Sequence, residues 1–166
     1  MSEFTEIDEL LFDFHGRIER HGWMVMQVMG GGDRRGAPWA YTIGLADRYG
    51  HPELTVVGLD HDSSEFHLQE AATRVARGED LAAAPVVEFD RVRMKVRPVH
   101  WQHWTTDRFA MWVNYYGALG RHPDPRAVQL VWPDDRGRYP GQKGFDPMFR
   151  GLQPRLDRAP RARRAA

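Results

Sequence analysis

Short runs of β-forming residues alternate with amphipathic stretches along this chain, and their order restricts the fold more than any other feature of the sequence. The amphipathic stretches are expected to be helices, because their apolar residues recur with the 3.6-residue period of an α-helix. In chain order the sequence predicts a helix, three strands, a helix, a stretch of strand that changes phase, a helix and a last strand. This order indicates an α+β single domain, with a mostly antiparallel sheet or a small split-barrel-like sheet and about three flanking helices.

Three amphipathic stretches are expected to form the helices. The first covers residues 6–20, where apolar side chains follow one face and Gly22 can end the helix in a left-handed conformation. The second is expected to begin at residues 62–63 and the third at residues 106–107, where serine, threonine or aspartate can cap a helix N-terminus. Glycines follow both of these stretches and are expected to end them.

Four runs rich in β-branched and aromatic residues are expected to be strands. They cover residues 23–29, 39–45, 54–59 and 127–132. Residues 86–101 also alternate, but their apolar positions change from odd to even numbers around Asp90-Arg91. Because a shift of one residue turns every side chain to the other face, we expect a bulge or a turn at this point.

Length and composition exclude several classes of protein. The chain has 166 residues, of which 42% are hydrophobic, so it fits one domain with a substantial core. It contains no cysteine, which excludes disulfides, thiolate metal sites and cysteine nucleophiles. No apolar run reaches the roughly 18 residues of a membrane span, and the N-terminus is acidic where a secretory signal is basic. We therefore expect a cytoplasmic protein without a membrane partner.

A net charge of zero conceals an asymmetry between the two halves of the chain. Residues 1–83 contain 7 basic and 15 acidic side chains, whereas residues 84–166 contain 16 basic and 8 acidic ones. Five arginines lie between residue 155 and the C-terminus. We expect residues 1–155 to form the domain and residues 156–166 to be a basic, disordered tail. The alternative is an anionic partner for the tail, although the chain is not expected to bind nucleic acid.

Eight histidines raise the question of a metal site. His100 and His103 have a spacing that suits one side of a helix, but the residues around them favour a strand end or loop, where the rings point to opposite faces. His61 and His67 form a second candidate pair beside two aspartates. No HExxH or comparable spacing of ligands is present. We therefore expect no metal, and these four histidines are the candidates if one is bound.

The expected strand over residues 39–45 is the first candidate for a ligand site. Gly44 lies inside it, and a glycine in a strand usually marks a bulge or the close approach of a backbone or ligand. Tyr41 and Thr42 place neighbouring hydroxyl groups on opposite faces of the same strand. The alternative interpretation is that these hydroxyl groups satisfy hydrogen bonds in the core.

Two further features could contribute to a site. His51 and Glu53 share a face if a strand begins there, and an imidazole beside a carboxylate can perform acid–base catalysis. They could equally organise a turn. Trp132 precedes a Pro-Asp-Asp-Arg-Gly turn and can form an aromatic wall together with Tyr139, or pack a hairpin.

The most distinctive motifs of the chain occur together. They are His21-Gly-Trp, Tyr41-Thr-Ile-Gly-Leu, His51-Pro-Glu-Leu, Gly58-Leu, Val128-Gln-Leu-Val-Trp-Pro-Asp and Gly137-Arg-Tyr-Pro. In this combination the chain resembles a bacterial family that is common in actinobacteria, domain-of-unknown-function family 4262, over about residues 18–155. The family brings no established catalytic residues. Its members often have a tryptophan where this chain has Gly141.

The sequence leaves three hypotheses for function. The first is a small-ligand or cofactor-binding domain, including a flavin-linked enzyme, because the order of elements resembles the start of flavin-binding split barrels. Its pocket would be lined by Tyr41, Thr42, Gly44 and Trp132. The alternative is a non-catalytic interaction or homodimer module. The third is a metal-assisted hydrolase that uses His51, His61, His67 or His100.

Overall fold

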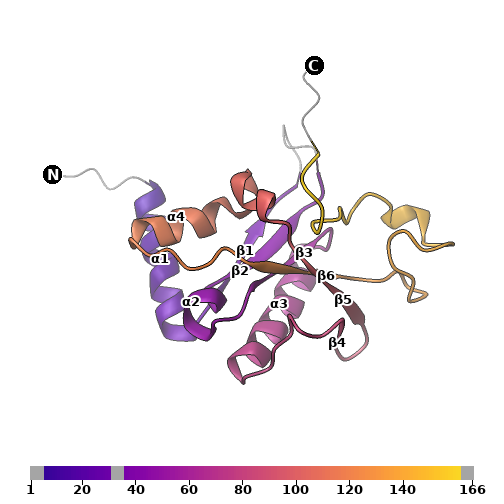
Figure 1. Cartoon of the computed structure of the whole chain (residues 1–166), viewed down its shortest axis with the longest axis horizontal. Helices are drawn as coiled ribbons and strands as arrows, with labels where there is room; N and C mark the ends of the chain where they lie inside the picture. The colour runs from indigo at the N-terminus through magenta and orange to yellow at the C-terminus, as the bar shows by residue number, and fades with distance from the viewer. Residues whose placement is uncertain (1–5, 31–35, 162–166) are drawn as a thin grey trace, which may run out of the picture.

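The computed structural model describes residues 6–30 and 36–161, and its centre is one six-stranded sheet (Figure 1). The spatial order of the strands is β1-β2-β3-β6-β5-β4. The strands are β1 (Met24–Val28), β2 (Trp39–Ile43), β3 (Glu53–Val57), β4 (Val86–Glu88), β5 (Arg93–Pro98) and β6 (Ala127–Val131). The expected strands therefore form, and the strand expected over residues 39–45 ends two residues early.

The sheet is mixed and open. Four of its neighbouring pairs are antiparallel, and only β3 and β6 run parallel. This confirms a mostly antiparallel α+β fold, whereas the sheet is not closed into a barrel. The two edge strands are β1 and β4, which lie at opposite ends of the strand order.

Four α-helices accompany the sheet. They are α1 (Glu6–His21), α2 (Leu45–Tyr49), α3 (His61–Ala76) and α4 (Ala110–Ala118). Short 3₁₀ helices form at η1 (Trp101–Thr105), η2 (Asp107–Phe109) and η3 (Pro147–Phe149). The sequence predicts α1, α3 and α4, but α2 is additional. None of the helices in the described residues is both long and apolar enough to cross a membrane.

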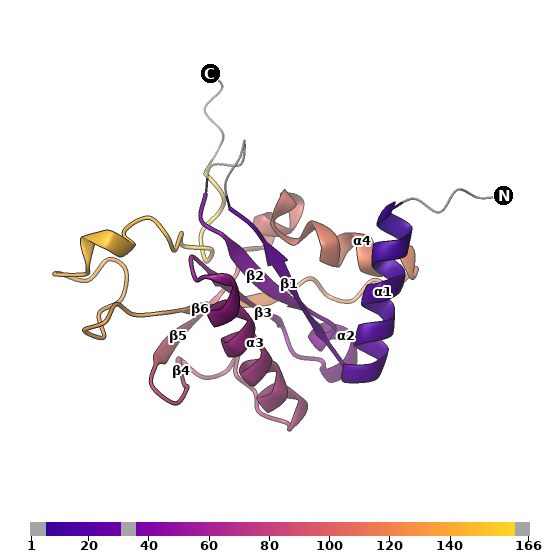
Figure 2. The ribbon, with the colours of Figure 1, turned by 180° about the vertical axis from the view of Figure 1, so that it is seen from behind.

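The alternation of each strand builds one core on each face of the sheet. Leu54 and Val56 of β3 pack with the apolar side of α3 on one face. Tyr41 and Ile43 of β2 pack with α1 and α4 on the other face. Figure 2 shows α3 on one side of β1 and α1 on the other. Because β-strand side chains alternate between faces, a residue's odd or even position decides which core it enters.

The phase change at Asp90-Arg91 is a turn. It joins β4 to β5, and the backbone N–H of Phe89 donates to the carbonyl of Val92 at 2.8 Å. The stretch over His100 to His103 differs from the expectation, because it lies at and inside η1 instead of at a strand end. Strand β5 ends at Pro98. The side chain of His100 then accepts the N–H of Gln102 as an N-cap, which starts a helical turn in place of a strand.

Two buried glutamines attach the C-terminal segment to β6. The side chain of Gln129 accepts the N–H of Leu156 and donates to the carbonyl of Pro154. Gln153 forms the same pair of bonds with the backbone of Trp132. Leu156 is 1% exposed. The first residues of the expected tail therefore pack on the domain, while residues 162–166 lie outside the described residues.

Leu156 is expected to contribute to the core as a domain residue. Leu156→Ala should lower the free energy of unfolding by about 2–4 kcal/mol, because a fully buried leucine leaves a cavity when truncated. Urea unfolding of the two proteins measures the difference. Leu10→Ala is the matched control, since Leu10 is 42% exposed and its truncation should cost much less. An equal loss in both variants would contradict the docking of this segment.

Candidate functional site

The hydroxyl groups of Tyr41 and Thr42 bond inside the protein. Tyr41 is 1% exposed, and its oxygen accepts the backbone N–H of Met111 at 3.2 Å. Thr42 is fully buried; its hydroxyl donates to the Glu53 carboxylate at 2.6 Å and accepts the N–H of Leu54 at 2.9 Å. Burial raises the pKa of the Tyr41 hydroxyl well above its ordinary value. Both side chains thus have the environment of core residues.

Glu53 is the centre of a buried polar network. Its side chain is fully buried, and the two carboxylate oxygens accept bonds from three elements, β2, the start of α2 and α4. The donors are the hydroxyl of Thr42, the backbone N–H groups of Gly44, Leu45 and Ala46, and the indole N–H of Trp112. The carboxylate therefore satisfies the first N–H groups of α2, which no side chain of that helix caps.

Gly44 is required by this arrangement. It precedes α2 with a φ of 121°, a conformation that side chains with a Cβ rarely adopt. A Cβ on Gly44 would lie 2.7 Å from the carbonyl oxygen of Gly22. The close approach that a glycine at this position predicts is therefore made by backbone, where α1 leads into β1.

Burial raises the pKa of Glu53 to about 7, and the surrounding donors, with Thr42 the largest contribution, oppose that rise. A carboxylate in this state is normally a functional candidate. Here both oxygens of the Glu53 side chain accept hydrogen bonds from the protein itself. This indicates a structural role for the group, which joins β2, α2, β3 and α4.

His51 does not form a pair with Glu53 in the described structure. Its Nδ1 donates to the carbonyl of Pro52 at 2.6 Å, and its Nε2 accepts the N–H of Ala82 at 3.3 Å. Asp80 lies 3.7 Å from the same Nε2. Both ring nitrogens thus connect the start of β3 to the loop after α3. The two candidate acid–base residues belong to separate networks.

Trp132 lies on the opposite face of the sheet from Tyr41. It packs in the core under α3, whereas Tyr41 belongs to the core under α1 and α4. Its indole N–H donates to the carbonyl of Val57 at 2.8 Å, and its ring contacts Phe149 edge-on. The four residues predicted to line one ligand pocket therefore do not meet in one.

The candidate metal ligands are also dispersed. His61 is exposed and contacts Asp62 at the start of α3, while His67 lies on the same helix against Phe89. The N-cap bond of His100 uses its Nδ1, and His103 donates through Nε2 to the carbonyl of Arg158 at 2.8 Å. Burial lowers the pKa of both His67 and His103. No group of three or more histidine, aspartate or glutamate side chains suited to a metal occurs within the described ranges.

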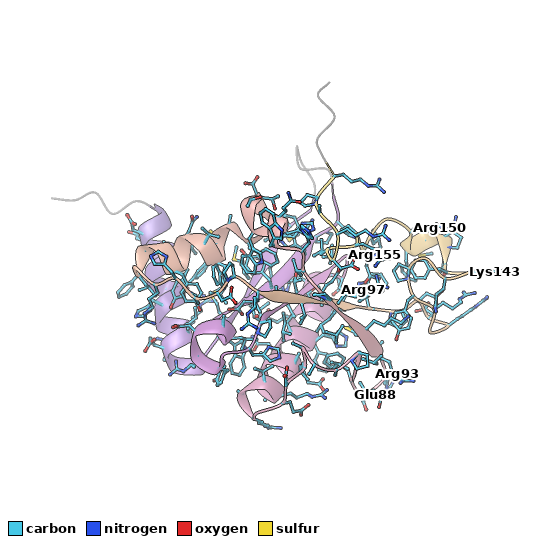
Figure 3. All side chains as sticks on the ribbon, in the orientation of Figure 1. Glu88, Arg93, Arg97, Lys143, Arg150 and Arg155 are labelled. Carbon is cyan, nitrogen blue, oxygen red and sulfur yellow. The ribbon has the colours of Figure 1, made fainter. Side chains whose placement is uncertain are left out.

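A pocket that the sequence does not predict lies between η1, η2 and the C-terminal segment. Its volume is about 600 Å³, within the range of small-molecule sites. We call it the arginine pocket, because its charged lining consists of His103, Arg108, Arg155, Arg158 and Arg161. Pro154, Leu156 and Pro160 add apolar surface. In the view of Figure 3, Arg155 of the C-terminal segment is labelled next to Arg97 of β5.

Arg108 is the unusual member of this lining. Its Nη1 is buried and has no hydrogen-bond partner in the described structure. Its guanidinium lies over the ring of Trp39, 5.0 Å from the ring centre, and the indole N–H of Trp39 donates to the Arg108 carbonyl. Burial lowers the pKa of Arg108. Since a desolvated cation is unfavourable without a counter-ion, this side chain has an unmet requirement for an anion.

The carboxylates nearby do not meet that requirement. Asp157 pairs with Arg155 and leaves the other arginines of the pocket unpaired. Across the described residues, no ion pair involves Arg108, Arg158 or Arg161. The arrangement can bind and orient an anionic group. The charge asymmetry of the sequence is the only signal that points toward it.

Comparison with known proteins gives one match. A family model described as a domain of unknown function (DUF4262) matches residues 17–146, which is most of the chain. It confirms the resemblance carried by the sequence motifs. No curated protein and no solved structure matches the chain.

Two substitutions separate a core role from a ligand-binding role for β2. Thr42→Val and Tyr41→Phe should each lower the free energy of unfolding by about 1–3 kcal/mol, because each leaves a buried partner without its bond. Thermal or urea unfolding provides the measurement. If both variants kept wild-type stability, the hydrogen bonds of these two hydroxyl groups would not stabilise the fold.

Glu53→Gln tests the buried network. The amide nitrogen cannot accept from the N–H groups around it, so a loss of about 2–3 kcal/mol in unfolding free energy is expected. Because folding raises the Glu53 pKa from 4.5 to about 7, the contribution of this group to stability is full below pH 4.5 and is lost as the pH rises to about 7. The variant should lack this pH dependence. Glu88→Gln, at an exposed ion pair with Arg93, is the control and should retain it.

Proposed function

The chain belongs to the DUF4262 family, and we propose that it is a small-ligand-binding domain whose arginine pocket takes an anionic ligand. The observation that carries this proposal is Arg108, which lines the pocket and whose guanidinium has no ion pair within the described residues and a buried Nη1 without a hydrogen-bond partner. An anion seated there would supply the missing counter-ion. Arg158 and Arg161 would add charge from the other wall.

The chemistry of the pocket favours a ligand with a phosphate or carboxylate group and an apolar portion. Guanidinium groups bind such planar or tetrahedral anions through two hydrogen bonds. Pro154 and Pro160 would contact the apolar portion. The role of these residues is binding and orientation, and a bound cofactor would supply any redox step.

A flavin mononucleotide is the cofactor to test first, since its phosphate and ring fit this description. The element-order analogy no longer supports it, because the sheet is not a closed barrel. The visible absorbance of the freshly purified protein, and titration with flavin mononucleotide, decide whether a flavin binds. As part of this proposal, we place the protein in the cytoplasm.

The alternative proposal is a non-catalytic interaction module. It is favoured by large apolar side chains that stand exposed on separate elements, including Phe12, Phe66, Trp101 and Met148. Such a module would bind neither phosphate nor flavin mononucleotide. A metal-assisted hydrolase gains no support, because its candidate histidines do not gather into a group of three or more metal ligands within the described residues.

Arg108→Met tests the binding proposal. Removal of an unpaired, largely buried charge should raise the melting temperature without ligand, and should abolish the further rise that phosphate gives the wild type at constant ionic strength. Differential scanning calorimetry with phosphate or chloride measures both effects. Arg93→Met, at the exposed ion pair with Glu88 (Figure 3), should respond to phosphate as the wild type does. A wild type that gives no phosphate-dependent rise would overturn the proposal.

A further inference from the structure

β1 is an edge strand with one free side. Among the described residues it pairs with β2 alone, and it lies between α1 and α3 (Figure 2). A groove of about 550 Å³ opens along its first residues, lined by Met24 and Val25 together with residues of α1 and α3. The first residues of β1 therefore border an open groove.

The hydrogen bonds of β2 identify which groups these are. The carbonyls of Pro38 and Ala40 both accept bonds from the β3 side, from the N–H of Gly58 and the hydroxyl of Thr55. Because the N–H and C=O of successive residues point to alternate sides of a strand, Tyr41 directs its groups toward β1. Tyr41 is paired with Met26.

It follows that Met26 bonds to β2, whereas its two neighbours face outward. Val25 and Gln27 direct their N–H and C=O groups to the free edge. No hydrogen bond to these four groups is made within the described ranges. A strand added at this edge could therefore form backbone hydrogen bonds with Val25 and Gln27, the two residues on either side of Met26.

This edge lacks the features that usually prevent strand addition. Proteins protect edge strands by shortness, charges, prolines or bulges. β4, at the other edge, has only three residues and includes Glu88, which pairs with Arg93. β1 has five residues, Met-Val-Met-Gln-Val, with neither a charge nor a proline.

We propose that β1 pairs antiparallel with β1 of a second copy, about a two-fold axis at Met26. In this register Val25 and Gln27 of the two copies form hydrogen-bonded pairs, which use all the outward groups of both residues. The two Met26 side chains face each other in the intervening non-hydrogen-bonded pair, where cross-strand side chains are closest. The two sheets become one.

The charges beside the strand suit a second copy better than an unrelated segment. Arg20 and His21 line the groove at the Val25 end of β1. Glu65 lines the same groove from α3 and lies 3.3 Å from the side chain of Gln27. Antiparallel pairing brings Gln27 of the second copy opposite Val25, and so carries Glu65 of that copy toward Arg20 and His21. The dimer does not depend on a ligand in the arginine pocket.

Opposite charges at Met26 test the register. The wild type should elute from size-exclusion chromatography with light-scattering detection at twice the chain mass of 19.2 kDa. Met26→Glu and Met26→Lys should each be monomeric, because like charges face each other, and a mixture of the two should form a one-to-one heterodimer. Met148→Glu, at a methionine that is 77% exposed on η3, should remain dimeric.

Amide hydrogen exchange gives a second measurement that does not depend on a substitution at the interface. The amides of Val25 and Gln27 should exchange more slowly as protein concentration rises, whereas the Met26 amide should be protected at every concentration. A wild type that is monomeric at all concentrations would overturn the dimer. Single Met26 variants that remain dimeric, or Val25 and Gln27 amides without concentration dependence, would overturn this register.

Discussion

One carboxylate joins four elements of this fold, β2, α2, β3 and α4. Glu53 begins β3, and its oxygens hold the end of β2, the first turn of α2 and the indole of Trp112 on α4. A buried charge is unfavourable unless its hydrogen-bonding capacity is met, and here the protein meets it entirely from its own donors. The position of α2, the end of β2 and the seating of α4 all depend on this group. The YTIGL and HPEL motifs are thus parts of one structural network.

The contrast between two buried charges directs attention to function. Glu53 has a full set of partners, whereas Arg108 has an Nη1 without one. Glu53 is fully buried and Arg108 is partly buried, so burial opposes the charged form of both groups. In the first case the protein offsets this cost internally. In the second case, no ion pair or hydrogen bond to Nη1 of Arg108 occurs in the described residues. An anionic ligand is the simplest group that would supply the counter-charge.

The two edges of the sheet show a similar contrast. β4 is short and carries an ion pair, while β1 is longer, uncharged and directs the backbone groups of two residues outward. The arginine pocket and the free edge are built from different elements. The proposed ligand binding and the proposed self-association therefore rest on separate parts of this domain.

Local sequence determined the elements with a strong period or a strong turn. The apolar stripe of α1, the β-branched run of β6 and the turn at Asp90-Arg91 follow from neighbouring residues, and the structure confirms them. The five-residue helix α2 cannot be predicted from its own residues. A helix of little more than one turn shows no hydrophobic period, and the carboxylate that caps it comes from β3.

The sites were decided by tertiary structure. The sequence indicated five chemically unusual residues, Tyr41, Thr42, Gly44, His51 and Glu53. It could not show that the hydrogen bonds of these residues are made to one another and to neighbouring groups of the protein. It also could not place Arg108 beside residues 155–161, since that pocket forms only when Leu156 bonds to Gln129 on β6. Sequence periodicity reports which face of an element is apolar. Whether a buried polar group finds a partner depends on segments that only the folded chain brings together.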